Sequence, residues 1–194
     1  MSNIPTTSDE ILASARALIV AGGYNGFSYA DIAKVVGIRK ASIHHHFPAK
    51  ADLVRTLVAR YREEARAGLA AIDAHHLDPG DRLRAYAGYW EACIGDASAP
   101  ICICALLATE IPVLPADVAV EVRAHFRTLS DWLATVLERG EQMGRLRLAA
   151  PPQDEAELFM ATVHGAMLSA RAYGAPAMFA TALSPLLGRL LPQN

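Results

Sequence analysis

The stretch FSYADIAKVVGIRKASIHHHFPAK, residues 27–50, contains two short helical patterns separated by a glycine. Ser28 and the acidic residue three positions later have the spacing of a helix N-cap, and Gly37 ends the first pattern. The second runs from about Arg39 to Phe47 and is closed by a proline. Two short helices joined by a tight turn are typical of a helix-turn-helix, whose second helix lies in the DNA major groove. We predict this motif over residues 28–47.

Helical periodicity continues on both sides of the motif. Residues 7–10 have the spacing of a capping box, and a long helix is expected to begin near Lys50. No run of strict polar–apolar alternation is long enough for a strand. The sequence therefore predicts an all-α fold of about nine helices, with a helix-turn-helix head over residues 1–50 and a body for effector binding and dimerisation over residues 51–194.

Composition limits the classes of protein to consider. The chain has 194 residues, 53% of them hydrophobic, which is enough for a core and too apolar for a disordered tail. No signal peptide precedes the first helix, and the longest uncharged window of the central region, 97–109, is too short for a bilayer. We expect a cytoplasmic protein. An odd number of cysteines without a secretion signal favours thiols over a disulfide framework.

The net charge of −2 conceals an asymmetry. Residues 1–66 carry nine Lys and Arg against six Asp and Glu, whereas residues 67–194 carry nine against fourteen. A basic head on an acidic body suggests that the head meets a polyanion.

Three consecutive histidines, 44–46, first suggest a metal site or a catalytic cluster. At about 100° per residue they fan out around the helix, whereas ligands on one helix share a face at a spacing such as i, i+4. No nucleophile or carboxylate pair is placed beside them by spacing. We therefore predict no metal site, no cofactor and no catalytic residues; solvated histidines without a role remain the plain alternative.

The same projection favours DNA reading. Ile43 and Phe47 mark a buried face and His45 points away from it. Ala41 keeps the exposed face slim, Ser42 can exchange hydrogen bonds with bases, and Lys40 or Arg39 suits guanine acceptors or phosphate. Ser28, at the start of the first motif helix, and Lys50, at the start of the long helix, suit phosphate oxygens.

Residues 27–53 resemble the DNA-binding segment of the tetracycline-repressor (TetR) family, which reads roughly T-x-x-x-I-A-x-x-x-G-V-S-x-G-x-L-Y-x-H-F-x-x-K-x-x-L. The departures are Arg39 for a small cap, Ala41 for a glycine, His44 for a tyrosine, and Phe27-Ser28 for a threonine-rich entry. The positions that fit are Ser28, Ile32, Ala33, Gly37, Ile38, Ile43, His46, Phe47, Lys50 and Leu53.

This resemblance implies a repressor and a set of DNA contacts. It also implies that His46 packs beside Phe47. Base or phosphate contacts are implied for Arg39, Lys40, Ala41, Ser42, His44 and His45, and phosphate contacts for Ser28, Tyr29 and Lys50.

Residues 158–188 contain one charged side chain, Arg171. Prolines and polar residues interrupt the stretch too often for a membrane hairpin. We expect a homodimer interface in which helices from two subunits pack together, with part of the stripe serving the core of the chain. A dimer predicts a palindromic operator. The interface candidates are Ala161, Gly165, Ser169, Ala172, Phe179, Leu183, Leu186, Leu187 and Leu190.

The middle helices are expected to enclose an effector pocket, although an aromatic stripe at helical spacing is more often core. The candidates are Tyr86, Tyr89, Trp90, Phe126 and Trp132, with Glu110 and His125 as polar anchors.

CICALLATE, residues 102–110, resembles the C-L-x-x-x-L-A-x-E segment of TetR regulators that respond to electrophiles. Two positions apart, Cys102 and Cys104 are expected on nearly opposite faces of a helix, which disfavours a shared metal or a mutual disulfide. Cys102 is the candidate sensor; a buried cysteine acting as a small hydrophobe is the alternative.

Together these features predict a dimeric transcriptional regulator of double-stranded DNA, released from its operator by a small-molecule or thiol-reactive effector and not an enzyme. The alternatives are a helical small-molecule carrier or a protein-interaction adaptor that retains a helix-turn-helix scaffold. Salt-dependent duplex binding discriminates between them.

Overall fold

The computed structural model describes residues 6–97 and 99–191, and its contacts divide them into two compact units. One unit combines the residues up to Glu63 with Ile103–His125, and the other combines Glu64–Cys102 with the residues from Phe126 onward. All regular structure in these two described ranges is helical, with nine α-helices and one short 3-10 turn. The predicted all-α class is confirmed.

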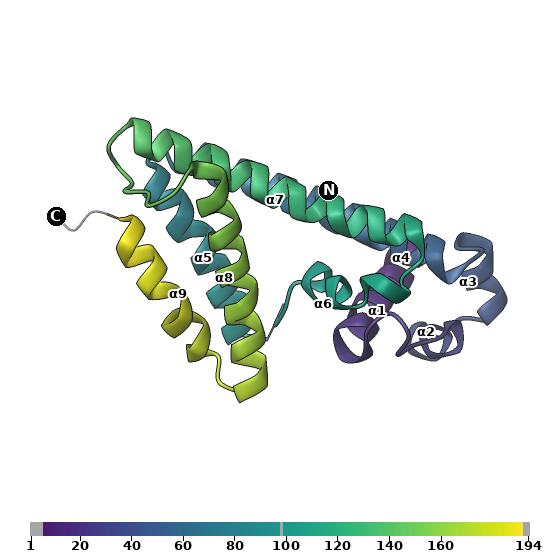
Figure 1. The fold of residues 1–194 in the computed structure, drawn as a ribbon. Helices are drawn as coiled ribbons and strands as arrows, with labels where there is room; N and C mark the ends of the chain where they lie inside the picture. The colour runs from purple at the N-terminus through teal and green to yellow at the C-terminus, as the bar shows by residue number, and fades with distance from the viewer. Residues whose placement is uncertain (1–5, 98, 192–194) are drawn as a thin grey trace. The chain divides into compact units, whose positions relative to one another are not determined.

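Three helices form the N-terminal part of the first unit: α1 (Thr7–Gly22), α2 (Tyr29–Val36) and α3 (Lys40–His46) (Figure 1). The capping box of α1 begins one residue earlier than predicted. The Thr6 N–H and hydroxyl donate to the Asp9 carboxylate at 2.9 and 2.7 Å, and the Asp9 N–H donates back to the hydroxyl at 3.3 Å. Two adjacent threonines each stand three residues before an acid, so spacing alone did not distinguish them.

Helices α2 and α3 both fall within residues 28–47, the range predicted for the motif. The Asp31 carboxylate accepts from the N–H and the hydroxyl of Ser28 at 2.8 and 2.7 Å, at the start of α2. Gly37 ends α2 with a left-handed φ of 76°, a conformation that costs glycine little because it has no Cβ. The N–H of Phe47 donates to Ile43 O at the end of α3. This geometry leaves α2 and α3 packed against one another.

An apolar core holds these helices together. It takes side chains from α1, α2, α3, the residue that follows α3 and the first two turns of α4 (Lys50–His75), so the orientation of α3 depends on this shared core. The fully or almost fully buried members are Ile11, Ile19, Ile32, Ile43, Phe47, Leu53 and Val54.

The first unit also contains a segment from the middle of the chain. This segment comprises α6 (Ile103–Thr109), the 3-10 turn η1 (Ile111–Val113) and the start of α7 (Ala116–Gln142). Helix α6 packs against α1 (Figure 1). Part of the sequence assigned to the body therefore folds with the head.

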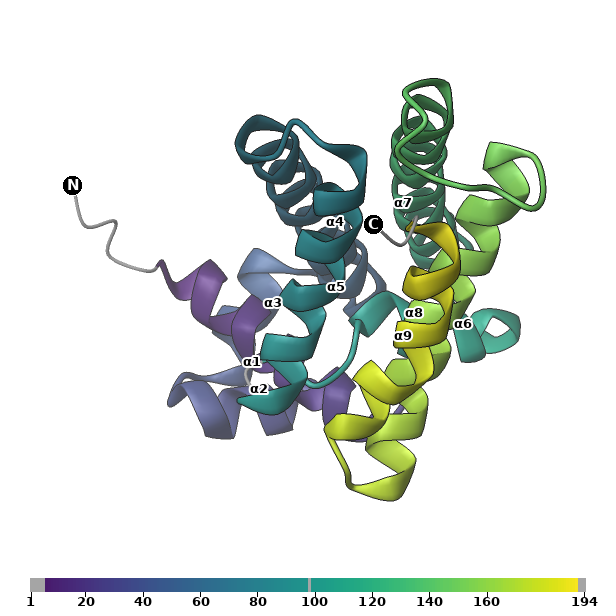
Figure 2. The same cartoon turned by 90° about the vertical axis from the view of Figure 1, so that its left-hand side faces the viewer.

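The second unit contains α5 (Pro79–Gly95), α8 (Pro152–Tyr173) and α9 (Ala177–Leu190), together with the later parts of α4 and α7. Helices α8 and α9 lie side by side in both ribbon views (Figures 1 and 2). Glu155, which is 2% exposed, joins them by accepting hydrogen bonds from Arg189 at 2.8 and 2.6 Å. No helix within the described ranges is long and apolar enough to cross a membrane.

Candidate DNA interface

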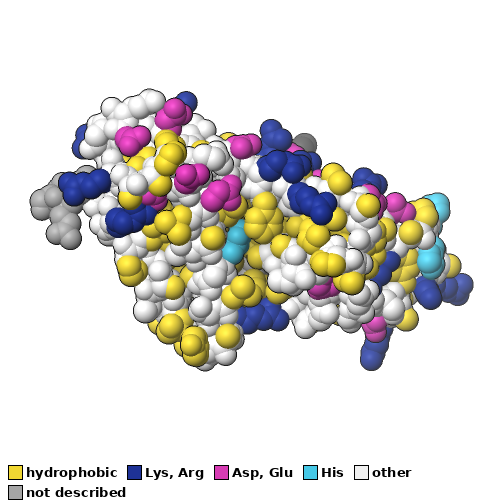
Figure 3. Space-filling model, viewed as in Figure 1, with side chains coloured by type: hydrophobic (Ala, Val, Ile, Leu, Met, Phe, Trp, Pro, Cys, Tyr) yellow, Lys and Arg dark blue, Asp and Glu magenta, His cyan; other side chains and the backbone are white. Residues whose placement is uncertain are grey.

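Helix α3 exposes the face that its helical projection predicted. Ile43 is completely buried and Phe47 is 6% exposed, while Ala41 and His45 face solvent. Arg39 and Lys40, at the start of the helix, are also exposed, and Ser42 is half-buried. Histidine side chains gather beside basic ones over this part of the surface (Figure 3). The exposed face therefore combines small, polar and cationic groups, which is the chemistry that reads base edges and phosphates.

His46 is exposed, and its ring centroid lies 6.4 Å from that of Phe47 and 5.6 Å from that of His45. The implied position beside Phe47 agrees with this arrangement, although the imidazole is not enclosed.

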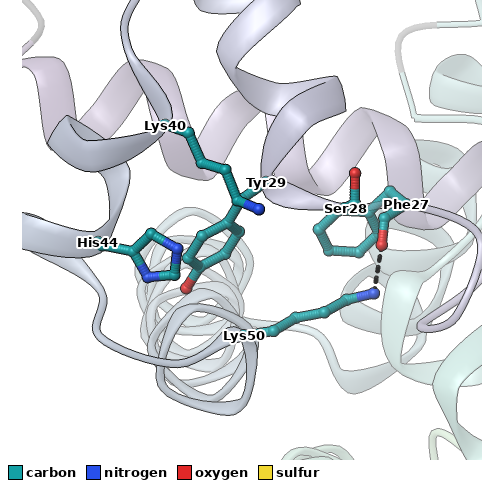
Figure 4. A pocket seen from close by; sticks show the side chains of 6 residues that line it. All are labelled: Phe27, Ser28, Tyr29, Lys40, His44 and Lys50. Atoms are coloured by element: carbon teal, nitrogen blue, oxygen red, sulfur yellow. Dashed lines mark hydrogen bonds between the residues drawn. The ribbon is translucent and has the colours of Figure 1, made fainter.

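An open pocket of about 260 Å³ lies where the start of α2 meets α3 and α4 (Figure 4). A hydroxyl, an imidazole and two ammonium-bearing chains contribute to it, a set of groups suited to an anion such as a backbone phosphate. Its lining residues are Phe27, Ser28, Tyr29, Lys40, His44 and Lys50.

The Tyr29 hydroxyl is used inside the motif. Tyr29 is 6% exposed, and its hydroxyl donates to Phe47 O at 2.8 Å, joining the start of α2 to the end of α3. Burial, with smaller contributions from Asp52 and Tyr24, raises the pKa of Tyr29 to about 12. The edge of the His44 ring packs on the tyrosine ring, with centroids 4.7 Å apart. Tyr29 therefore forms the pocket wall and positions His44.

The Lys50 ammonium also turns inward. It donates to Phe27 O (Figure 4). It also lies 4.0 Å from the centre of the Phe27 ring and 4.9 Å from that of the Tyr24 ring. Burial lowers the pKa of Lys50, and the nearby carboxylates of Asp31 and Glu110 oppose that shift. Lys50 therefore lines the pocket with its ammonium directed towards the Phe27 carbonyl.

Glu110, the predicted polar anchor of an effector pocket, lies in the first unit against the turn between α1 and α2. Both of its carboxylate oxygens accept from the Tyr24 N–H, at 3.2 and 3.0 Å. Gly23 has a φ of 73°, and a Cβ placed there would stand 2.1 Å from Glu110 Oε1. Sequence reasoning missed this contact because its partners are 86 residues apart; the only local signal was the pair of glycines ending α1.

Two family models match the chain. Residues 11–57 match the model described as bacterial regulatory proteins, tetR family, and residues 79–186 match the tetracyclin repressor-like C-terminal domain. The chain belongs to the TetR family. It is therefore a DNA-binding transcriptional regulator, and regulators of this family are generally not enzymes.

Solved structures agree with this assignment. A TetR-family transcriptional regulator from Agrobacterium tumefaciens is 62% identical, with 95% of this chain and 97% of that chain covered and a TM-score of 0.94. A TetR regulator from Legionella pneumophila is 28% identical, with the same coverage and a TM-score of 0.83. The reduced form of NemR from E. coli shares the fold at 20% identity, with coverages of 97% and 100% and a TM-score of 0.84. No curated protein matches the chain.

The aromatic candidates for the effector pocket of this TetR regulator cluster in its second unit. Tyr86 is 4% exposed and Trp90 is 6% exposed. The Tyr86 ring centroid lies 5.7 Å from that of Trp132 and 6.4 Å from that of Phe159, and burial raises the pKa of the tyrosine. Phe126 is half-buried against His164 at 5.1 Å, whereas Tyr89 is 54% exposed.

His125 belongs to the first unit of this regulator. It is 2% exposed, and its ring centroid lies 5.2 Å from that of Tyr61. The two predicted polar anchors, Glu110 and His125, thus share a unit with the DNA interface.

The cysteines of this TetR chain do not follow the predicted helical geometry. Helix α6 begins at Ile103, so Cys102 precedes the helix and the expectation of opposite faces is wrong. Both Cys102 and Cys104 are completely buried. Within the first unit, the Cys104 sulfur lies within 4.8 Å of a ring nitrogen of His125. Cys93 is half-buried in α5.

The dimer candidates divide between surface and core. On α8, Ala161, Gly165 and Ala172 are exposed and Ser169 is half-buried. On α9, Leu187 is half-buried, but the other four candidates lie in the core of the second unit because this side of α9 packs on α5 and α8. These four, which therefore do not offer a surface to a second copy, are Phe179, Leu183, Leu186 and Leu190.

Proposed function

We propose that this TetR regulator is a homodimeric repressor that binds a palindromic operator through α3 and leaves it when an effector is bound. The observation that carries the proposal is the exposed face of α3 beside an open pocket with cationic walls. A helix presented in this way enters the major groove while the neighbouring pocket meets the backbone.

Base reading is assigned to the exposed side chains of α3 and its N-terminal approach. Lys40 or Arg39 donates to guanine or phosphate, Ser42 exchanges hydrogen bonds, and Ala41 allows close approach to the base edges. His44 and His45 add polar contacts from the same exposed surface.

Phosphate binding is assigned to the pocket at the start of α2. Lys40 contacts the DNA backbone directly, since it is exposed. Ser28 is exposed too, but its hydroxyl donates to Asp31, so it contacts a phosphate only after leaving that partner. Lys50 adds positive charge beside Phe27. The buried Tyr29 side chain forms the inner wall of the pocket.

The dimer interface with a second copy of the chain is assigned to the exposed face of α8. Uncharged residues recur there at intervals of three and four, the spacing of a helix–helix seam. The exposed members of this α8 stripe are Leu158, Ala161, Gly165, Leu168 and Ala172. A dimer presents two copies of α3 to successive turns of the duplex, which makes the operator palindromic.

The effector is a small molecule or a thiol-reactive compound. The buried aromatic residues around Tyr86 suit an apolar ligand. Cys102 is the candidate for an electrophile, and because its thiol is completely buried, the reaction requires a conformation that exposes it. Either one weakens operator binding only by favouring the conformation that binds DNA less well. Replacement of Cys102 by Ser should abolish release by electrophiles such as N-ethylmaleimide, and unchanged release would leave the small molecule as the effector.

Selection of bound duplexes from genomic fragments tests the proposal, followed by titration at several salt concentrations. Affinity should fall steeply with salt, and Lys40→Ala should weaken binding and reduce the salt slope by about 1. His45→Ala should change which duplexes are selected. If the protein binds no duplex at low ionic strength, that result would instead favour a small-molecule carrier or a protein-interaction adaptor.

A further inference from the structure

The turn between α1 and α2, residues 23–28, is held from two directions by charged side chains. Glu110 reaches it from the end of α6, and Lys50 reaches it from the start of α4. Neither side chain belongs to the helix-turn-helix, but both hold the chain that leads into it.

Glu110 is fitted closely to the turn. Both oxygens of the Glu110 carboxylate accept from the Tyr24 N–H, in the turn that follows α1. The carboxylate could not keep this position beside any residue other than glycine at position 23, since an added Cβ would overlap Glu110 Oε1. A charged acceptor on a backbone N–H is among the stronger hydrogen bonds in proteins. The carboxylate therefore fixes the position of Tyr24.

From Tyr24 a continuous series of contacts leads to the pocket. The Tyr24 ring packs on the Lys50 ammonium, which donates to Phe27 O and lies over the Phe27 ring. Phe27 lines the pocket next to Tyr29. The Tyr29 ring contacts the His44 ring, and the Tyr29 hydroxyl donates to Phe47 O at the end of α3. Every contact in this series lies within the first unit.

We propose that Glu110 is a positioning residue for the DNA interface, through which the segment 103–113 and the DNA-binding face of the motif stabilise one another. The inference rests on the proposed function, because it concerns the same DNA interface. The segment belongs in sequence to the C-terminal family model, yet it folds with the head.

Coupling of this kind is reciprocal. If the placement of the segment 103–113 raises DNA affinity, bound DNA must stabilise that placement by the same free energy. The prediction can be tested without an identified effector, by measuring how DNA changes hydrogen exchange in this segment.

The sign of the effect separates positioning from simple electrostatics. Loss of a carboxylate near the interface should by itself raise affinity for a polyanion. Loss of the hydrogen bond should lower affinity, by about tenfold, a typical size for coupling between sites. Glu110→Ala removes both the charge and the acceptor, whereas Glu110→Gln removes the charge and retains an oxygen that can accept from Tyr24.

The experiment uses the full-length protein and a duplex selected by the wild type. Glu110→Ala should weaken binding about tenfold at every salt concentration with an unchanged salt slope, because no phosphate contact is lost. Glu110→Gln should bind like the wild type or slightly better. Asp117→Asn is the matched control: it removes a carboxylate that acts electrostatically on Tyr24 but makes no hydrogen bond to the turn in the described contacts. It should also not weaken binding.

Hydrogen exchange supplies the second readout. DNA should slow exchange of the amides of residues 103–113 in the wild type and much less in Glu110→Ala. The inference would be overturned by any of three results: equal DNA affinity of Glu110→Ala and the wild type, a changed salt slope in Glu110→Ala, or hydrogen exchange in residues 103–113 that is the same with and without DNA. Failure of the wild type to bind any duplex would overturn the proposed function instead, so the two failures are distinguishable.

Discussion

At the scale of single residues, some groups with suitable chemistry for DNA contact serve inside the motif. Tyr29 and Lys50 carry donors that suit phosphate oxygens, yet both donate to backbone carbonyls of the same unit. The buried carbonyl of Phe47 needs a donor, because an unpaired buried polar group is costly. In the proposed function, direct DNA contact is therefore assigned to the exposed side chains, above all Lys40 and His45.

Replacement of Tyr29 by Phe tests this division of roles. The variant should lose about 1 kcal/mol of unfolding free energy, because the Phe47 carbonyl loses its donor while the ring remains. Urea denaturation measures the loss. Tyr173→Phe is the matched control, since Tyr173 is 73% exposed, and it should change stability little. Equal stability of both variants would show that the hydroxyl contributes nothing to the motif.

At the scale of elements, two glycines with positive φ end successive helices but differ in ψ, which is −171° at Gly23 and 26° at Gly37, and in their surroundings. Gly23 and Gly37 have φ values of 73° and 76°. A Cβ at Gly37 would meet nothing within 4 Å, whereas one at Gly23 would meet Glu110. The first glycine therefore serves both the backbone conformation and the approach of another segment.

Substitution of each glycine by alanine should separate these effects. Gly37→Ala should cost about 1 kcal/mol from backbone conformation alone. Gly23→Ala should cost more, by about 1 to 3 kcal/mol, because a positive φ combined with a ψ near 180° is costlier for a residue with a Cβ and because the new Cβ displaces the Glu110 carboxylate. Thermal and urea unfolding provide the comparison, and addition of Glu110→Ala to Gly23→Ala should recover part of the difference. No recovery would mean that the carboxylate is not the obstacle.

The pair Glu155–Arg189 fastens α9 to α8 and makes stability depend on pH. Hydrogen bonds from Arg189 lower the pKa of Glu155, with burial opposing them. Because the folded pKa lies below the unfolded one, this stabilisation is present above the ordinary value of 4.5 and is lost as the pH falls through the lowered pKa.

Glu155→Gln should therefore destabilise the protein near neutral pH, by about 2 kcal/mol, and flatten the stability profile below pH 4.5. Urea midpoints measured between pH 7 and acid provide the test. Glu138→Gln, at an exposed position on α7, is the control and should keep the wild-type profile. A Glu155→Gln profile parallel to that of the wild type would rule out this carboxyl as a source of acid sensitivity.

At the scale of the whole molecule, the two compact units do not coincide with the division predicted from sequence. The segment after Ile103 returns to the unit that carries the DNA interface, while α5, α8 and α9 form the other unit. The exposed α8 stripe belongs to this second unit and has no charged member. DNA binding and assembly are thus assigned to separate units of one chain.

Gly165→Glu places a charge in the middle of the α8 stripe, where the structure has open space for the side chain. The variant should fold but sediment as a monomer, because an unpaired charge is costly in an apolar seam. Binding to a full palindrome should weaken about a hundredfold, and binding to a half-site should change little. Val120→Glu, at another exposed apolar position, should remain dimeric. A dimeric Gly165→Glu would place the interface elsewhere.

Much of the head was predictable because its signals are local. The cap at Ser28, the break at Gly37 and the burial of Ile43 and Phe47 depend on residues a few positions apart, and the structure confirms each of them. The predicted start of α1 was one residue late because Thr6 and Thr7 each stand three residues before an acid. The error at the cysteines came from extending α6 by one residue.

The sequence by itself determined the helix-turn-helix, its exposed face and the helical class, since caps, glycines and periodicity act within one or two turns. The tertiary structure alone decided that Tyr29 and Lys50 turn inward, that four apolar residues of α9 are core, and that Glu110 binds the turn at Tyr24. Periodicity defines which residues share a face of a helix, but the partner of that face depends on segments far apart in the chain.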